Sequence, residues 1–493
     1  MNIKKNTIWN IAESIIGFLV GLSIARSIIS LLGIDQYGLF VILSMLSGYG
    51  VISLFDLGMT GAIISFASQY RNIKESVLLT KLWVFSIIFY FIIACLAVLT
   101  CIYIVKVDVG SILTKIDSLK ISREIIFPAL LLTFISFTSY SFIAFIQSYE
   151  LYRYLQIINI TGHLCRAVSA FYFISSENGL LYFLYAIVSI RLIQTAALFL
   201  VLILLLKDLR RVIFPEFSLI LVWLKYSTIL FGSALVGFFM NMFDKLLITA
   251  KLPFGDVGFY DVINKPANGL RMGLAVLYSA VEPATVRIFS NGGKPAIKRF
   301  YLDCSLNISV IIIPLIITSF LNMRSILSVW LGDDQISDNL VYATVCAGIY
   351  VLLIIQSSIA NIMLVAIRLG KKILPIQIFT AIVVVILMLL SIDNYGIWGC
   401  IISILIGYLI SSFMILKIFY FYLEFKGKDI LTEVVNFIVT ILLSIACCLV
   451  GHFVFDNDNI LELLSLMLCE LLLIWALLYL IYYKNKYHQY WLR

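Results

Sequence analysis

"GFYDVINKPANGLRMGLAVLYSA", residues Gly258 to Ala280, lies among apolar segments long enough to cross a lipid bilayer. The stretch nevertheless contains three charged residues, Asp261, Lys265 and Arg271. Because successive helical residues turn by about 100°, Asp261 and Lys265 share one face with Asn268, and Arg271 flanks that face. A membrane helix with such a face is expected to line a polar cavity, and a bend is expected beside the charges at Pro266.

The composition of the whole chain sets the class of protein. Of the 493 residues, 62% are hydrophobic and 13% are charged, and the mean hydropathy is +1.07. A soluble core could not bury so much apolar surface. Apolar segments of the length that spans hydrocarbon recur to the C-terminus, so the sequence predicts an all-α polytopic membrane protein with about 14 transmembrane helices.

An internal repeat suggests how these helices are grouped. "VGLSIARSIISLLGIDQYGLFVIL" near the start resembles "VGFFMNMFDKLLITAKLPFGDVGFYDVI" in the middle of the chain. We therefore predict two parallel six-helix lobes, residues 1–211 and 212–423, followed by two additional helices and a cytoplasmic tail in residues 424–493. Gly38 and Gly258 are expected to begin helices after tight turns. Gly17 and Gly21 form a small-residue face on the first helix, which is typical of close helix packing.

The charged loops predict the orientation. Under this helix assignment the basic clusters all fall on one side of the membrane: Lys4/Lys5, Arg71/Lys74, Lys207/Arg210/Arg211, Arg287/Lys294/Lys298/Arg299, Arg368/Lys371/Lys372, Lys426/Lys428 and Lys484/Lys486. That side should be the cytoplasm, with both termini on it. The net charge of +8 is dispersed over short loops, so it gives no support to nucleic-acid binding.

The usual sequence signs of catalysis are missing. The chain has no Walker A loop, no G-x-S-x-G, no H-E-x-x-H and no C-x-x-C. Its nine cysteines lie in or beside apolar segments without ligand-like spacing to histidine. We therefore predict that the protein is not an enzyme and has neither catalytic residues nor a metal site. His163 is expected to form a polar contact with a neighbouring helix, and the alternative is a proton relay.

Several stretches resemble one known family. "LLGIDQYGLF", "LFDLGMTGA", "LKYSTILFGSALVGFFMNMFDKLLI" and "VGFYDVINKPANGL" are similar to the Wzx-type polysaccharide flippases, which handle O-antigen or capsule repeat units within the multidrug/oligosaccharidyl-lipid/polysaccharide (MOP) exporter superfamily. The resemblance implies a MATE-like fold in the bacterial inner membrane. It further implies that the chain moves an undecaprenyl-pyrophosphate-linked oligosaccharide to the periplasmic leaflet by alternating access, without a cofactor. Membrane lipids and other polysaccharide assembly proteins are the expected partners.

Intramembrane charges concentrate in the first eight predicted helices, whereas helices nine to fourteen are expected to be nearly free of charge inside. Membrane charges usually face an interior or a water-filled cavity. The candidates to bind the pyrophosphate are the cations Arg26, Lys245, Lys265 and Arg271. The candidates to balance these charges, to gate the cavity or to take a coupling H+ or Na+ are the acids Asp56, Asp244 and Asp261.

Simpler and competing explanations remain for these residues. The acids could pair with basic residues only to hold helices together, Asp261 with Lys265 one turn on and Asp244 with a base across the bundle. A drug or cation antiporter of the same superfamily is the second function, although its cavity would favour acids over cations. A membrane polysaccharide polymerase is third, and it would normally carry a large periplasmic loop or a soluble catalytic region.

Overall fold

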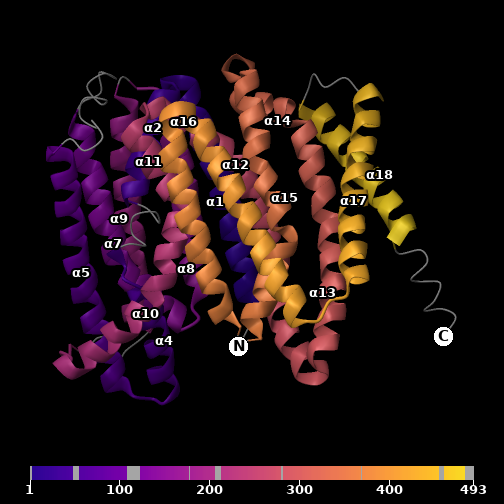
Figure 1. Cartoon of the computed structure of the whole chain (residues 1–493). Coiled ribbons are helices and arrows are strands. Elements are labelled where there is room, and N and C mark those ends of the chain that lie inside the picture. Colours follow the sequence, from indigo (N-terminus) through magenta and orange to yellow (C-terminus); the bar gives the residue numbers. More distant parts are fainter. Residues whose placement is uncertain are drawn as a thin grey trace. The chain divides into compact units, whose positions relative to one another are not determined.

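A computed structural model describes residues 3–47, 55–107, 123–176, 178–205, 212–278, 281–367, 369–454 and 460–482 (Figure 1). Within these ranges the chain is helical and contains no strand, and ten of its helices are long and apolar enough to cross a membrane. The predicted all-α membrane fold is therefore confirmed, and the protein is a multi-pass membrane protein. Some residues of the orientation argument lie outside the described ranges: Lys207, Arg210, Arg211, Arg368, Lys484 and Lys486.

Two long helical segments each contain a break in the backbone, which affects how the observed helices compare with the predicted number of helices. In α13 (Val281–Leu321), Gly293 has a φ of 60°, and in α16 (Gly370–Tyr422), Gly396 has a φ of 55°. Only glycine adopts this backbone conformation at little cost, so each segment is two helices joined at a glycine. With these two divisions the number of described helices is roughly consistent with the predicted count of about 14.

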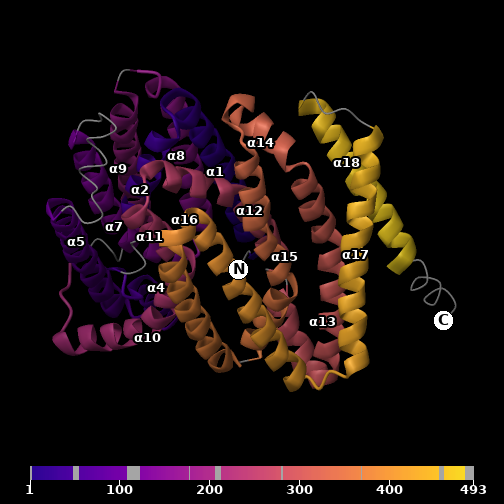
Figure 2. The same cartoon turned by 45° about the horizontal axis from the view of Figure 1, so that its top comes forward.

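The chain forms two compact units. The first unit comprises residues 1–261 with 392–397, and its described part includes the following helical elements: α1 (Ile3–Leu32), α2 (Ile34–Ser47), α4 (Met59–Asn72), α5 (Ser76–Lys106), η2 (Arg123–Ile125), α7 (Ile126–Ser148), α8 (Tyr152–Phe173), α9 (Gly179–Leu205), α10 (Phe217–Asn241) and α11 (Phe243–Lys251). Its core gathers aromatic side chains, among them Trp83, Phe145 and Trp223, where α4, α5, α7 and α10 meet. Figure 2 shows α10 beside α4.

The second unit comprises residues 262–391 and 398–493. Besides most of α13 and α16 it contains α14 (Met323–Leu331), η4 (Asp333–Gln335), α15 (Asp338–Ala366), α17 (Gly427–Val454) and α18 (Ile460–Tyr482). α13 packs on both α15 and α17, as Figure 1 shows. The core of this unit includes Tyr301, Val351 and Phe419. α12 (Phe254–Tyr278) crosses the boundary between the units at Asp261, so the predicted lobes 1–211 and 212–423 are divided at a different place and stay a prediction.

Gly38 and Gly258 are not at helix starts, so that prediction was wrong. Gly38 lies in the second turn of α2 and Gly258 in the second turn of α12. A Cβ atom on Gly38 would overlap the Phe254 carbonyl, and one on Gly258 would lie 2.6 Å from the Ile34 carbonyl oxygen. Each glycine therefore receives the carbonyl of the residue four positions before the other one. This reciprocal contact joins the two copies of the internal repeat backbone to backbone.

The small-residue face of the first helix is used at only one of its two glycines. A Cβ on Gly17 would lie 3.0 Å from the His163 ring of α8, whereas a Cβ on Gly21 would have no neighbour within 4 Å. The same ring reaches Glu13 on α1, with 3.1 Å between Nε2 and Oε1. The polar helix contact predicted for His163 is thus present, and Gly17 gives the imidazole room to reach its partner.

Two other local predictions, the bend at Pro266 and the charge-free late helices, can be compared with the structure. α12 continues as a helix through Pro266, and the break in the seventh predicted helix lies between α10 and α11, at Met242 with a φ of −133°. The expectation of charge-free late helices was wrong at Glu433 in α17, whose side chain is buried. Glu433 lies within two turns of the start of α17. In the sequence, a charge at that position resembles one at a helix end beside a loop.

Candidate functional site

The predicted acids and lysine of α11 and α12 form one polar cluster with α2. The Lys245 ammonium donates to Asp261 at 2.6 Å, and Tyr37 of α2 donates its hydroxyl to the other oxygen of Asp261, also at 2.6 Å. Tyr260 donates to Asp244 at 2.6 Å, and Asp244 also accepts the Lys245 backbone N–H at 2.8 Å. The side chains of the ion pair are 18% and 12% exposed, so water screens their attraction little.

The short break before α11 places this cluster. Because Met242 interrupts the helix, Asp244 falls in the first turn of α11, where an acid is stabilised by the helix dipole. Asp244 and Lys245 then lie near the start of α12, from which Tyr260 and Asp261 extend. Asp261 thus pairs with Lys245 of α11, a partner that the sequence did not predict, and Asp244 accepts from a tyrosine of α12.

Asp56 is held in place by α4 and α5. Its carboxylate accepts from the Tyr90 hydroxyl at 2.5 Å, from the Thr60 hydroxyl at 2.6 Å and from the Thr60 backbone N–H at 3.2 Å. The next two residues, Leu57 and Gly58, have φ values of 51° and 74°. A side chain on Gly58 would overlap the backbone of α10. The "DLG" stretch therefore caps α4 and lets α10 pass close by, which favours a structural role for Asp56.

Arg271 has a different environment in the second unit. Its guanidinium carbon lies 5.7 Å from the centre of the Tyr350 ring, and that ring stacks on Tyr408 with 4.8 Å between centroids and 15° between planes. Among the ion pairs of the described residues, none includes Arg271. The Tyr350 ring stabilises the guanidinium charge through its π face. Because the ring is neutral, the positive charge of Arg271 can still attract an anion.

The remaining two predicted cations lie on α12 and α1. Lys265 is half-buried on α12, and Arg26 is exposed on α1. Both make interactions with other groups of the protein. Along the axis of α12, Lys265 and Arg271 are six residues apart, or about 9 Å.

The tyrosines that hold these charges were missed from the sequence. Tyr37, Tyr90 and Tyr260 each donate to a predicted acid, and Tyr350 lies under the predicted arginine. No pattern in the sequence points to Tyr90 or Tyr350, because their partners are far away along the chain. Tyr260 directly precedes Asp261, and Tyr37 belongs to the first repeat copy, so these two could have been suspected.

The polar cluster and Arg271 supply fixed charge at helix faces of a membrane protein. This charge is balanced in the first unit and supported by aromatic rings in the second. Such charges can bind and orient a polar ligand electrostatically. Among the described residues, no group of three or more His, Cys, Asp or Glu side chains could hold a metal ion.

Comparison with known proteins shows the fold. No protein-family model matches the chain, and no curated protein sequence matches it. Among solved structures, the lipid II flippase MurJ in an inward closed conformation aligns with a TM-score of 0.71 and 13% identity, over 97% of this chain and 99% of that one.

Other solved structures agree. An inward-facing multidrug resistance MATE transporter of the MOP superfamily aligns with a TM-score of 0.63 and 14% identity, over 83% of this chain and 94% of that one. A MOP superfamily transporter from Pyrococcus furiosus aligns with a TM-score of 0.56 and 16% identity, over 85% of this chain and 96% of that one. The chain therefore has the fold of MOP superfamily transporters, as its sequence predicted.

Proposed function

We propose that the protein is a flippase that moves an undecaprenyl-pyrophosphate-linked oligosaccharide from the cytoplasmic to the periplasmic leaflet of a bacterial inner membrane. The observation that carries this proposal is Arg271. An arginine within a membrane helix costs up to about 2.5–3.5 kcal/mol on insertion scales, so an arginine without an acidic partner is retained for function. Among the described ion pairs Arg271 has no such partner, and its contact is with Tyr350.

The chemistry of the guanidinium fits a pyrophosphate. Its planar fork of N–H groups can form two parallel hydrogen bonds to a phosphate, which an ammonium cannot do. Moving a pyrophosphate through hydrocarbon without such partners would cost tens of kcal/mol. Lys265, about 9 Å away along α12, would provide a second cationic position, and Arg26 and Lys245 are the further candidates. Lys245 would have to give up part of its pairing with Asp261 to bind an anion.

The comparisons support the transport class but leave its substrate open. One structural neighbour is a lipid II flippase, and others are multidrug transporters. We favour the lipid-linked substrate because Arg271 on α12 is a cation whose described contact is with an aromatic ring and not with an acid. The Pyrococcus transporter, whose description reports a binding pocket of reversed polarity, illustrates that pocket charge varies within this fold.

Substitution of Arg271 tests the proposal. In cells that depend on this protein for surface polysaccharide, Arg271→Ala should stay in the membrane at normal level, abolish surface polysaccharide and trap lipid-linked oligosaccharide in the cytoplasmic leaflet. Arg271→Lys should keep part of the export, because charge survives without the two-pronged contact. Tyr350→Phe should export normally and Tyr350→Leu poorly, since only the former keeps the π face.

The matched control is Arg324→Ala, which removes an exposed arginine of the same unit that pairs with Asp338 at 2.6 Å. This variant should export normally. Normal export by a stably inserted Arg271→Ala protein would refute the role of Arg271. Resistance to cationic drugs that the protein confers, with no effect on lipid-linked oligosaccharide, would instead identify the antiporter.

A further inference from the structure

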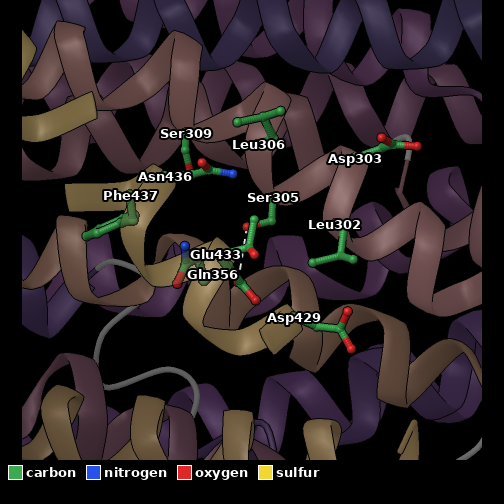
Figure 3. A pocket seen from close by; sticks show the side chains of 11 residues that line it. Leu302, Asp303, Ser305, Leu306, Ser309, Gln356, Asp429, Glu433, Asn436 and Phe437 are labelled. Carbon is green, nitrogen blue, oxygen red and sulfur yellow. Dashed lines mark hydrogen bonds between the residues drawn. The ribbon is translucent and has the colours of Figure 1, made fainter. Parts of the chain in front are cut away.

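A partly open cavity lies in the second unit, beside Glu433. It has a volume of about 200 Å³ and is lined by residues of α13, α15 and α17, among them the apolar Leu302, Leu306 and Phe437. Its lining is rich in oxygen atoms, which come from Ser305, Ser309, Gln356, Glu433 and Asn436 (Figure 3).

The lining follows from helix periodicity. Tyr301, Ser305 and Ser309 recur every four residues and so share one face of α13, while Glu433 and Asn436 share one face of α17. Glu433 is six residues from the start of α17, or about 9 Å along the helix, close to the predicted cytoplasmic side. The packing of α13 on α17 brings the two faces together.

Glu433 is a buried carboxylate held by three neutral donors. Its side chain is 4% exposed, and its oxygens accept from Tyr301 at 2.7 Å, Ser305 at 3.1 Å and Tyr420 at 3.0 Å. Hydrogen bonds from neutral groups supply no counter-charge to a carboxylate. No ion pair of the described residues includes Glu433, because the nearby Lys298 pairs with Asp429 at 2.5 Å. Within the described part of the chain, the charge of Glu433 is therefore left without a cation.

A second feature of the cavity also indicates a ligand. Ser309 is 3% exposed and its hydroxyl oxygen has no hydrogen-bond partner among the described residues. Buried hydroxyl groups are nearly always paired, so this one calls for a partner beyond the described residues, such as a bound ligand. Figure 3 shows Ser309 and Asn436 on one side of Glu433, with Asp303 and Asp429 farther out.

We propose that this cavity binds one Na+ ion, with the Glu433 carboxylate, the Ser309 hydroxyl and the Asn436 amide oxygen as ligands and water completing the shell. Oxygen ligands suit a hard cation. The single charge of the Glu433 carboxylate balances a monovalent ion, because the charge of Asp429 is already neutralised by Lys298. A proton would need no cavity, whereas a partly hydrated ion does. This site is independent of the transported substrate, although Na+ bound here could drive the proposed export.

The test measures Na+ binding to purified protein in detergent without lipid-linked substrate. At about pH 8, NaCl replaces choline chloride at constant ionic strength, and the unfolding midpoint is followed. Saturable binding should raise the midpoint of the wild type by about 1–3 °C, and KCl should raise it less. Glu433→Gln should abolish the Na+ response, and Ser309→Ala should weaken the apparent affinity for Na+ by about tenfold.

Glu470→Gln is the matched control, because Glu470 is a buried acid of the same unit on α18 and does not line the cavity. This variant should keep the full Na+ response. A Na+ response retained by Glu433→Gln would overturn the proposal, as would a wild-type midpoint that responds to pH but not to Na+. If Glu433→Gln does not fold, an unchanged Na+ affinity of Ser309→Ala is sufficient to overturn it. Because no export is measured, failure here is distinguishable from failure of the flippase proposal.

Discussion

Charged residues of this protein differ in how fully their neighbours satisfy them. In the first unit Asp56, Asp244 and Asp261 each accept two or more hydrogen bonds of ordinary length. In the second unit Arg271 has aromatic neighbours and Glu433 has neutral donors. Removing one partner of a buried ion pair is strongly destabilising, because the other charge is then left without a counter-charge in a medium of low polarity. The residues most available to ligands are thus in the second unit.

The pair of Lys245 and Asp261 can be tested by a double-mutant cycle. Asp261→Asn alone should lower the stability by about 3–5 kcal/mol, because it leaves a buried ammonium without a counter-charge. Lys245→Met together with Asp261→Asn should recover most of that loss, as measured from the unfolding midpoint in detergent. Export should remain low in the stable double variant, since Lys245 is also predicted to bind phosphate. Normal export would contradict that prediction.

At the scale of elements, the most constrained contact is the crossing of α2 and α12. Two helices approach this closely only where glycines remove the side chains between them. Gly38 meets the carbonyl of Phe254 and Gly258 meets the carbonyl of Ile34, so the crossing is symmetrical. The same segment positions Tyr37 to donate to Asp261. The glycine crossing and the polar cluster therefore form one structural assembly.

Gly38→Ala and Gly258→Ala should each destabilise the protein by about 1–3 kcal/mol, because the added methyl group forces the two helices apart. The measurement is the unfolding midpoint of the purified variants. Gly21→Ala provides the control, since Gly21 lies in a helix and an added Cβ would have no neighbour within 4 Å. That change should be neutral or stabilising by about 0.5–1 kcal/mol. Equal midpoints for Gly38→Ala and Gly21→Ala would show that the crossing does not require glycine.

At the scale of the whole molecule, transport by alternating access requires one end of the helix bundle to open. α2 belongs to the first predicted lobe and α12 to the second, and their reciprocal contact lies at the predicted periplasmic end. In this structure that contact is closed. We expect it to separate when the substrate leaves toward the periplasm.

A disulfide across this contact should arrest export. A Cβ on Gly255 would lie against the Asp35 carboxylate, so cysteines at these positions are close enough to be cross-linked. In a background without the nine natural cysteines, oxidation of the protein carrying Asp35→Cys and Gly255→Cys should reduce export at least tenfold, and a reductant should restore it. Cysteines in place of Ser86 and Ser141, whose hydroxyl oxygens are 2.6 Å apart within one lobe, are the control. Undiminished export by the oxidised double variant at positions 35 and 255 would exclude opening at this crossing.

The sequence by itself determined the class of fold. In hydrocarbon each backbone polar group must be satisfied within its own segment, so long apolar runs can only be helices, and their number and breaks can be read in order along the chain. The glycine breaks at Gly293 and Gly396 fall within "NGGKP" and "DNYG", short polar stretches that interrupt the apolar runs of the sequence. The internal repeat was also visible, and the contact of Gly38 with Gly258 gives it a structural basis.

Only the tertiary structure decided which groups meet. Periodicity places Asp261 and Lys265 on one helix face, but it could not show that Lys245 also pairs with Asp261, which it reaches because the chain breaks at Met242. From its place near the start of α17, Glu433 resembles a surface charge. Only the packing of α13 against α17 shows that it is buried beside Ser309. The physical reason is that helical spacing fixes the direction of a side chain from its own axis, whereas its partners depend on how other helices pack, and those contacts join residues far apart in the sequence.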